Sequence, residues 1–300
     1  MTANQTMYLV ETDWLSERLN DQSARILDVT GMLTSSLENL ARERVYNNGH
    51  IPEAVSFDVA SAKGELSDPN SKLPWTWPSA KQVEVAMSKH GVSNKTQVIL
   101  YAASPRPGVD FGPMWCTRAW WVLHHFGVDC AVLNGGLEKW VAEGRPVSVE
   151  PVSPTPTKFT ASGDGHEAVA GKQDVLAALD QDSVCVANAL APDIFDATSE
   201  TKFGSRKGHI TGSVSAPMQN LFLDDGHTFV DRKTMKRRLT DHGLKVDQPA
   251  ITYCGGGIAA TVDAFALRLL GNDDVRVYDA SLMEWANDDD LPMTDLSTTG

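Results

Sequence analysis

The chain has 300 residues, of which 42% are hydrophobic and 22% are charged, and its formal net charge at pH 7 is −13. This length and composition predict a globular protein with two ordinary domains. The excess of negative charge argues against an extended nucleic-acid surface, which needs clustered lysine and arginine. The sequence also lacks the run of roughly 18 apolar residues that a membrane span requires. We therefore expect neither nucleic acid nor a membrane among its partners.

The N-terminal stretch and the cysteines indicate a compartment. The start MTANQTMYLVETDW has neither the basic and apolar regions of a signal peptide nor an arginine-rich presequence, which predicts a cytoplasmic protein. The four cysteines form no C-x-x-C pair and no cluster with metal-ligand spacing, so we expect free thiols and no metal site. They are Cys116, Cys130, Cys185 and Cys254.

The first half of the chain alternates helical and extended patterns. Helices are expected at 11–20, 80–90 and 116–126, with a short one in the motif LNGGLEKW that begins at 133. Strands are expected at 25–29, 97–101 and 130–133, with a short one in GHIPEAVSFD at 49–58.

The second half repeats four blocks of the first half in the same order. VCVAN at 184–188 matches the strand RILDV, and GHITGSVSAP from Gly208 matches GHIPEAVSFD. ITYC then matches ILYA, and YDASLMEW at 278–285 matches LNGGLEKW. Four blocks in one order indicate a tandem duplication.

This alternation predicts two α/β domains, each a mostly parallel sheet flanked by helices. The expected domains are 1–149 and 172–300. Residues 150–171 are rich in proline, threonine, serine and glycine, which is typical of an extended connector.

The stretch Pro249–Leu270 carries the clearest chemical signal. A short apolar strand ends at Tyr253, Cys254 follows it, and three glycines precede an amphipathic helical pattern. Glycines let backbone N–H groups turn toward a common centre, and a helix N-terminus adds positive potential there. Such surroundings stabilise thiolates. We therefore expect Cys254 to be a reactive thiol, against the alternative of a buried structural cysteine.

The duplication supports that expectation because the two copies differ at this point. Tyr101 matches Tyr253, so Ala102 stands where the second copy has Cys254. The loop after Ala102 contains prolines where the second copy has glycines. The thiol and its loop are thus predicted to belong to the second domain alone.

Together these motifs resemble the two-domain rhodanese family of thiosulfate and 3-mercaptopyruvate sulfurtransferases. The resemblance extends from about Tyr8 to Met293 and is carried by the two GHI motifs, TRAWW at 117–121, LNGGLEKWVAEGRPV, YCGGGIAATVDAFAL and YDASLMEWANDDDLPM. It implies two tandem rhodanese-like domains, the N-terminal one inactive and the C-terminal one catalytic.

The resemblance also implies a reaction and its residues. Cys254 would take a sulfur atom from a small anionic donor, 3-mercaptopyruvate or thiosulfate, and pass it as a persulfide to cyanide or a thiol, with no cofactor. The implied substrate-binding residues are Gly255, Gly256, Gly257, Ile258, Ala259, Arg206 and Lys202.

Several positions depart from the family's pattern. The mercaptopyruvate enzymes usually have serine where this chain has Gly256, and a usual histidine in the first domain is Trp75. The family's Asp-x-Arg at the first strand of the catalytic domain reads Asn188-Ala189-Leu190. An arginine six residues before the second GHI motif is replaced by Lys202, whereas the arginine two before it is kept as Arg206. These changes put the identity of the donor in doubt. Because the loop is uncharged, 3-mercaptopyruvate is favoured slightly over thiosulfate.

Two other functions are conceivable for a cysteine in such a loop. A cysteine phosphatase of this fold needs an arginine six residues after the cysteine, where this chain has Ala260. A non-enzymatic sulfur carrier or regulatory binding module is the stronger alternative, because a guanidinium expected near the site is absent. His50 and His209, one in each GHI motif, and Trp140 and Trp285 are predicted to be structural.

Overall fold

The structure, a computed structural model, describes residues 7–298. It divides into two compact units. The first comprises the chain up to Pro69 together with Pro78–Asp164, and the second comprises Asn70–Trp77 together with the chain from Gly165 onward. The first six residues, which belong to the N-terminal stretch without signal-peptide features, lie outside the described residues, as do the last two of the predicted second domain.

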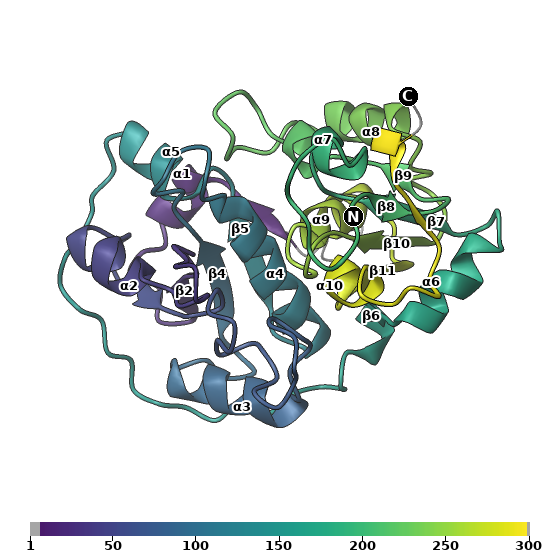
Figure 1. The fold of residues 1–300 in the computed structure, drawn as a ribbon. Helices are drawn as coiled ribbons and strands as arrows, with labels where there is room; N and C mark the ends of the chain where they lie inside the picture. The colour runs from purple at the N-terminus through teal and green to yellow at the C-terminus, as the bar shows by residue number, and fades with distance from the viewer. Residues whose placement is uncertain (1–6, 299–300) are drawn as a thin grey trace, which may run out of the picture. The chain divides into compact units, whose positions relative to one another are not determined.

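The first unit contains a parallel five-stranded sheet with the order β1-β5-β4-β2-β3 (Figure 1). Its strands are β1 (Leu9–Val10), β2 (Ala24–Asp28), β3 (Val55–Ser56), β4 (Gln97–Tyr101) and β5 (Cys130–Leu133). β2 and β4 pair from Ala24 with Gln97 to Asp28 with Tyr101. Residues 98–101 of β4 are fully buried, as expected for a central strand covered on both faces.

Four helices of the first unit lie close to the predicted positions, with two differences at their ends, whereas α2 was not predicted. The five helices are α1 (Thr12–Ser16), α2 (Ala41–Arg44), α3 (Ala80–Lys89), α4 (Gly112–His125) and α5 (Gly136–Ala142), with a 3-10 turn at Tyr46–Asn48. α1 is shorter than the predicted 11–20. α4 begins four residues before the predicted start because Pro113, in its first turn, is compatible with a helix N-terminus.

The second unit repeats this architecture, with the strand order β6-β11-β10-β7-β9. Its parallel strands are β6 (Val169–Ala170), β7 (Cys185–Asn188), β9 (Val214–Ser215), β10 (Ala250–Tyr253) and β11 (Val275–Tyr278). Its helices are α6 (Lys172–Leu179), α7 (Pro192–Phe195), α8 (Arg232–Asp241), α9 (Ala260–Leu270) and α10 (Ser281–Trp285), with 3-10 turns at His166–Ala168, Met218–Leu221 and Leu296–Thr298. Within the residues described, no helix is long and apolar enough to cross a membrane. The two equivalent sheets confirm the predicted fold.

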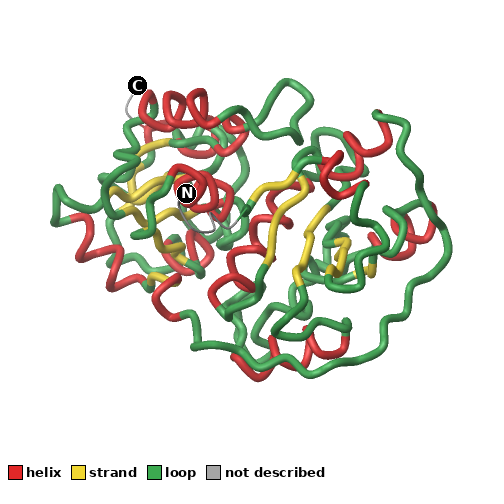
Figure 2. The backbone as a smooth tube through the Cα atoms, turned by 180° about the vertical axis from the view of Figure 1, so that it is seen from behind, coloured by secondary structure: helices red, strands yellow, loops and turns green. Residues whose placement is uncertain are grey.

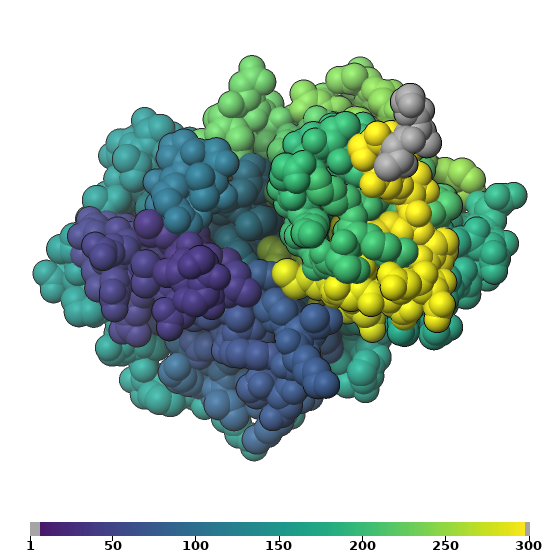
Figure 3. All heavy atoms as spheres, in the orientation of Figure 1, coloured from purple at the N-terminus to yellow at the C-terminus, as the bar shows by residue number. Residues whose placement is uncertain are grey.

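A small antiparallel ladder completes the second unit. β8 (His209–Ile210) pairs with β12 (Met293–Thr294), so the C-terminal segment lies beside the second GHI motif. Figure 3 shows these C-terminal residues, in yellow, against the green residues near 210.

The repeat extends to single hydrogen bonds. The hydroxyl of Tyr101 accepts a bond of 3.3 Å from the N–H of Ile51, and the hydroxyl of Tyr253 accepts one of 3.0 Å from the N–H of Ile210. In both units, the tyrosine that ends the central strand therefore holds the GHI motif in place.

The two GHI histidines have the same structural surroundings. Nδ1 of His50 lies 2.8 Å from the carbonyl oxygen of Tyr46, and the two rings stack at 3.9 Å between centroids. Nδ1 of His209 lies 2.8 Å from the carbonyl oxygen of Phe195, and those rings stack at 3.7 Å. Both histidines are buried and structural, as the duplication predicted.

The tryptophans of the last matched block are also equivalent. Nε1 of Trp140 donates to the carbonyl of Pro146 at 2.7 Å, and Nε1 of Trp285 donates to the carbonyl of Pro292 at 3.0 Å. Both indoles have no exposed surface, so these residues anchor the two cores as expected.

The segment predicted as a connector packs along the first unit. Figure 2 shows it as a long loop on the outside of that unit. The N–H of Thr157 donates to the carbonyl of Ser88 at 2.9 Å, and Asn94 exchanges two hydrogen bonds with Thr160. Phe159 is buried. The boundary between the units falls after Asp164, inside the predicted 150–171.

Candidate active site

Cys254 stands directly after β10, the central strand of the second sheet, between β7 and β11. In parallel sheets, ligand sites form beyond the carboxyl ends of such strands. Its N–H donates to Oγ of Ser281 at 3.1 Å, and its carbonyl accepts from the N–H of Leu282 at 3.1 Å. The first turn of α10 thus holds the backbone of Cys254. The residue is 2% exposed, which shields the thiol from bulk water.

Ser281 adopts a backbone conformation that is rare for a residue with a side chain. Its φ is +49°, and the matched position in the first unit is Gly136, with φ +56°. Its hydroxyl donates to the carbonyl of Tyr278 at 2.7 Å while accepting from Cys254. Left-handed conformations cost about 1–3 kcal/mol and persist where the surroundings hold them, often at functional sites. Because Gly136 has the same conformation without a side chain, the conformation belongs to the turn that begins α5 and α10 in the two units.

The loop after Cys254 consists of glycines partly because its neighbours leave no room for side chains. A Cβ atom at Gly255 would lie 2.1 Å from the ring of Phe203. A Cβ at Gly257 would lie 2.3 Å from the carbonyl oxygen of Asp279, and φ there is +75°. Gly257 therefore meets both a steric and a conformational requirement. The sequence predicts positive φ for all three glycines of the loop, but only Gly257 has it.

Gly256 faces a segment from the first half of the sequence. A Cβ at Gly256 would lie 3.0 Å from Sδ of Met283 and 3.2 Å from Cε3 of Trp75. The N–H of Trp77 donates to Oδ2 of Asp279 at 2.7 Å, which fastens the same segment beside Gly257. Sequence reasoning identified Trp75 as a departure from the family but did not place it against the loop, because contacts between distant segments leave no local pattern.

Ile258 and Ala259 lead into α9 and are both buried. Val262, Phe265 and Ala266 of the predicted apolar face are fully buried, whereas Leu269 is only partly buried. The burial extends to every residue of 260–267, so the helix is enclosed rather than amphipathic over this part. The loop is therefore held between a buried strand and a buried helix.

Arg206, predicted to bind substrate, makes a set of contacts with the end of α10. Its guanidinium donates to the carbonyl oxygens of Trp285 at 2.8 Å, Asp288 at 2.5 Å and Leu291 at 2.9 Å. These carbonyls include groups left without helical partners at a helix C-terminus. The geometry favours a structural role for Arg206.

Among the described residues, the two neighbouring lysines do not make such contacts with carbonyl groups, and their own surroundings differ. Nζ of Lys207 lies 2.9 Å from a carboxylate oxygen of Glu200 in an ion pair. Lys202, the other basic residue predicted to bind substrate, is exposed to solvent and precedes Phe203, the residue that covers Gly255. The charge of Lys207 is therefore already paired, whereas Lys202 is exposed beside the residue that covers Gly255.

The other three cysteines lack such surroundings. Cys116 and Cys130 are fully buried, and burial raises the pKa of each thiol well above its ordinary value. Burial also raises the pKa of the Cys185 thiol. Because the thiolate is the reactive form, these cysteines are expected to be unreactive.

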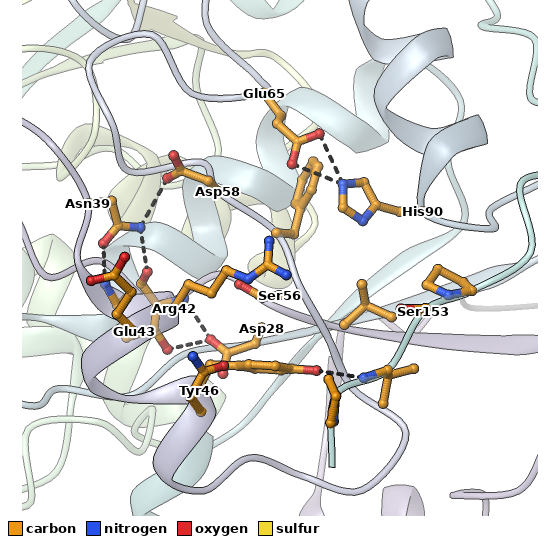
Figure 4. A pocket seen from close by; sticks show the side chains of 18 of the residues that line it. Asp28, Asn39, Arg42, Glu43, Tyr46, Ser56, Asp58, Glu65, His90 and Ser153 are labelled. Atoms are coloured by element: carbon orange, nitrogen blue, oxygen red, sulfur yellow. Dashed lines mark hydrogen bonds and ion pairs between the residues drawn. The ribbon is translucent and has the colours of Figure 1, made fainter. Parts of the chain in front are cut away.

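A cavity of about 500 Å³ opens in the first unit, at the carboxyl ends of β2 and β3 (Figure 4). It is lined by Asp28, Tyr46, Glu65 and His90, among others, and no cysteine lines it. Nε2 of His90 lies 2.9 and 3.0 Å from the two carboxylate oxygens of Glu65. The first unit therefore has polar groups at the same edge of its sheet but no nucleophilic sulfur there.

The model of the rhodanese-like domain matches residues 11–143 and 174–288. This chain belongs to the rhodanese family. It is 32% identical to the 3-mercaptopyruvate sulfurtransferase of Escherichia coli K12 over 291 residues, covering 96% of this chain and 98% of that protein. It is 31% identical to the thiosulfate sulfurtransferase of Rattus norvegicus, covering 94% of this chain and 93% of the relative.

Solved structures agree with this assignment. The crystal structure of SseA from Escherichia coli, a 3-mercaptopyruvate sulfotransferase, is similar with a TM-score of 0.78 at 30% identity, covering 92% of this chain and 99% of that one. EanB in complex with ergothioneine has a TM-score of 0.82, but at 21% identity it supports the fold alone.

Proposed function

We propose that this protein is a sulfurtransferase that moves a sulfane sulfur from 3-mercaptopyruvate or thiosulfate to cyanide or a thiol through a persulfide on Cys254. The observation that carries the proposal is Cys254 itself, a buried cysteine at the end of the central strand followed by a loop without side chains. Membership of the rhodanese family and two-domain sulfurtransferase relatives support it.

The first half-reaction transfers a sulfur atom from the donor to Cys254. The thiolate of Cys254 attacks the outer sulfur of the donor and forms a sulfur–sulfur bond. With thiosulfate, the donor's own S–S bond breaks and sulfite leaves with the electron pair. With 3-mercaptopyruvate, the C–S bond breaks and the resulting enolate takes up a proton to give pyruvate. Backbone N–H groups of the loop would stabilise the anionic sulfur in a nearly dry site.

The second half-reaction transfers the sulfur from the Cys254 persulfide to the acceptor. Cyanide or a thiolate attacks the terminal sulfur, the persulfide S–S bond breaks, and the thiolate of Cys254 leaves with the electron pair. The product is thiocyanate or a new persulfide. Dividing one transfer into two steps predicts ping-pong kinetics.

The proposal assigns binding to the loop and a lesser role to the basic residues. We propose that Gly255, Gly256 and Gly257, with Ile258 and Ala259, hold the anionic sulfur by their backbone. Lys202 would supply mobile positive charge for the donor, whereas Arg206 acts mainly through the end of α10. Four free cysteines fit a reducing compartment such as the cytoplasm.

The alternatives predict different measurements. A sulfur carrier would form a persulfide that does not turn over. A phosphatase would need a basic side chain six residues after the cysteine, but Ala260 stands there, fully buried as the first residue of α9.

The experiment measures initial rates of thiocyanate formation from cyanide with each donor, alongside the intact mass of the protein. We expect turnover and a sulfur adduct that both disappear in Cys254→Ser. Full sulfur transfer by Cys254→Ser would refute the proposal. An adduct without turnover would establish the carrier role instead.

A further inference from the structure

The cavity of the first unit, at the carboxyl ends of β2 and β3, is not used by the proposed reaction. Its volume of about 500 Å³ lies within the range of small-molecule sites. The described residues that line it all belong to the first unit. Charged side chains of both signs and apolar side chains share its wall, so the wall itself indicates what kind of molecule the cavity fits.

Asp28 supplies a buried carboxyl to this cavity. The residue is 3% exposed, and its Oδ1 accepts hydrogen bonds from the N–H and the hydroxyl of Thr30. Oδ2 has no hydrogen-bond partner among the described residues. Burial raises the pKa of this carboxyl, which the nearby hydroxyls of Thr30 and Tyr101 lower to a smaller extent. Ionising a buried carboxyl alone is costly, and a cationic group beside it would offset that cost.

Arg42 supplies an unpaired positive charge. It lies on α2, is exposed, and its guanidinium makes no hydrogen bond or ion pair within residues 7–298. Figure 4 shows the side chain extended across the cavity, with its guanidinium between Asp28 and His90 in this view. The carboxylate of Glu65 is already paired with His90 and with Lys89. An anionic group of a ligand is therefore the partner that the guanidinium lacks.

The second unit has amides where the first unit has these two carboxyl groups. Asn188 ends β7 as Asp28 ends β2, and in both residues Oδ1 accepts from the N–H two positions later. The histidine that follows α3 pairs with Glu65, whereas the histidine that follows α8 contacts the side chain of Asn220 at 2.8 Å. The fold itself therefore does not require a carboxyl group at either position.

The rest of the wall is apolar. Val55 and Phe57 line it from β3 and the residues that follow, and the ring of Tyr46 lines it from the 3-10 turn. Val152 of the connector completes this side, where its N–H lies 3.5 Å from the Tyr46 hydroxyl. Such a wall fits an aliphatic group of a ligand.

We propose that this cavity binds an α-amino acid with an aliphatic side chain, whose ammonium group lies beside Asp28 and whose carboxylate is held by Arg42. The inference goes beyond the proposed function, because it gives the first unit a ligand site that needs no cysteine. A molecule with both charges matches the wall best. A simple anion would leave the Asp28 carboxyl without a partner, and a simple cation would leave Arg42 without one.

The test compares three ligands that share one aliphatic group. L-leucine carries both charges, 4-methylpentanoate lacks the ammonium group, and 3-methylbutylamine lacks the carboxylate. None contains sulfur, so none is a substrate for Cys254. Isothermal titration calorimetry, with competition against leucine for the weaker ligands, should show that leucine binds about tenfold or more tightly than either analogue.

Two substitutions locate the two charges. Asp28→Asn, which introduces the residue found at the matched position of the second unit, should weaken leucine binding about tenfold and leave that of 4-methylpentanoate unchanged. Arg42→Gln should weaken leucine binding to a similar extent and leave that of 3-methylbutylamine unchanged. Arg44→Gln, on the same helix but outside the lining, is the control and should bind leucine as the wild type does. Thermal unfolding shows whether each variant is folded.

The inference is refuted if leucine does not bind, if either analogue binds as tightly as leucine, or if both substitutions leave leucine binding unchanged. A uniform loss of all three ligands in a folded variant would refute the position assigned to that charge. Leucine should bind equally well to Cys254→Ser, so the result does not depend on whether the protein transfers sulfur.

Discussion

The hydroxyl of Ser281 accepts a 3.1 Å hydrogen bond from the backbone N–H of Cys254, and it does so from a left-handed backbone conformation. The equivalent residue of the first unit, Gly136, has no side chain, and its loop has no cysteine. The contact therefore belongs to the copy that carries the thiol.

Two substitutions of Ser281 separate the contribution of its hydrogen bond to stability from the cost of its left-handed backbone conformation. Ser281→Ala leaves the buried N–H of Cys254 unpaired and keeps the left-handed conformation, so it should cost about 1–3 kcal/mol of unfolding free energy. Ser281→Gly loses the same bond but relieves the conformation and should cost less. Urea unfolding measures the difference, and equal losses in both variants would show that the strain is unimportant.

Arg206 is expected to act on stability. Arg206→Lys cannot reproduce a planar guanidinium that reaches several carbonyls, and we expect a loss of about 2–3 kcal/mol by urea unfolding. KM for either donor should change little at a temperature where the variant is folded. Lys202→Ala, at an exposed position, is the matched control and should leave stability unchanged. A raised KM at unchanged stability in Arg206→Lys would instead assign it to donor binding.

The third glycine of the loop should tolerate substitution least. Gly257→Ala adds the strain of a left-handed alanine, about 1–2 kcal/mol, to a collision with a backbone oxygen. Gly271→Ala is the matched control, because Gly271 has φ +95° but nothing within 4 Å of its Cβ position. We expect the midpoint of thermal unfolding to fall much further for Gly257→Ala, with loss of turnover. Similar midpoints would mean that the loop can shift away from Asp279.

Asp263, fully buried on α9, should make stability fall as pH rises. Burial raises the pKa of its carboxyl well above the ordinary value of 3.8, and neither of its oxygens has a hydrogen-bond partner among the described residues. Above pH 3.8 the unfolded chain releases this proton while the folded protein retains it, so ionisation favours unfolding.

Asp263→Asn should therefore be more stable than the wild type at pH 7 and should show a weaker decline from pH 4 upward. Asp290→Asn, at an exposed position, is the control. Urea unfolding across this range measures both variants. A parallel decline in wild type and Asp263→Asn would contradict the expectation.

Local patterns predicted the fold well because the core strands are both apolar and repeated. β4 and β5 have the bounds expected from the sequence, and the order of matched blocks predicted two equivalent sheets. Helix ends were less predictable. α4 starts at Gly112, four residues before the apolar pattern begins. Apolar periodicity does not reveal a first turn that lies outside the pattern.

The site was only partly predictable for a different reason. Cys254 and its glycines are adjacent in sequence, so their pattern is visible. The contact of Trp75 with Gly256 and the role of Arg206 at α10 depend on residues far apart in the chain. Only the folded structure brings these residues together.

The assignment of Asn70–Trp77 to the second unit has a consequence for any attempt to divide this protein. A fragment that begins at Gly165 contains Cys254 and its entire loop, and by its motifs it is a full catalytic repeat. It nevertheless lacks Trp75, which covers Gly256, and Trp77, which binds Asp279. The half that carries the nucleophile thus takes two residues beside its loop from the other half of the sequence, so the site is complete only in the full-length chain.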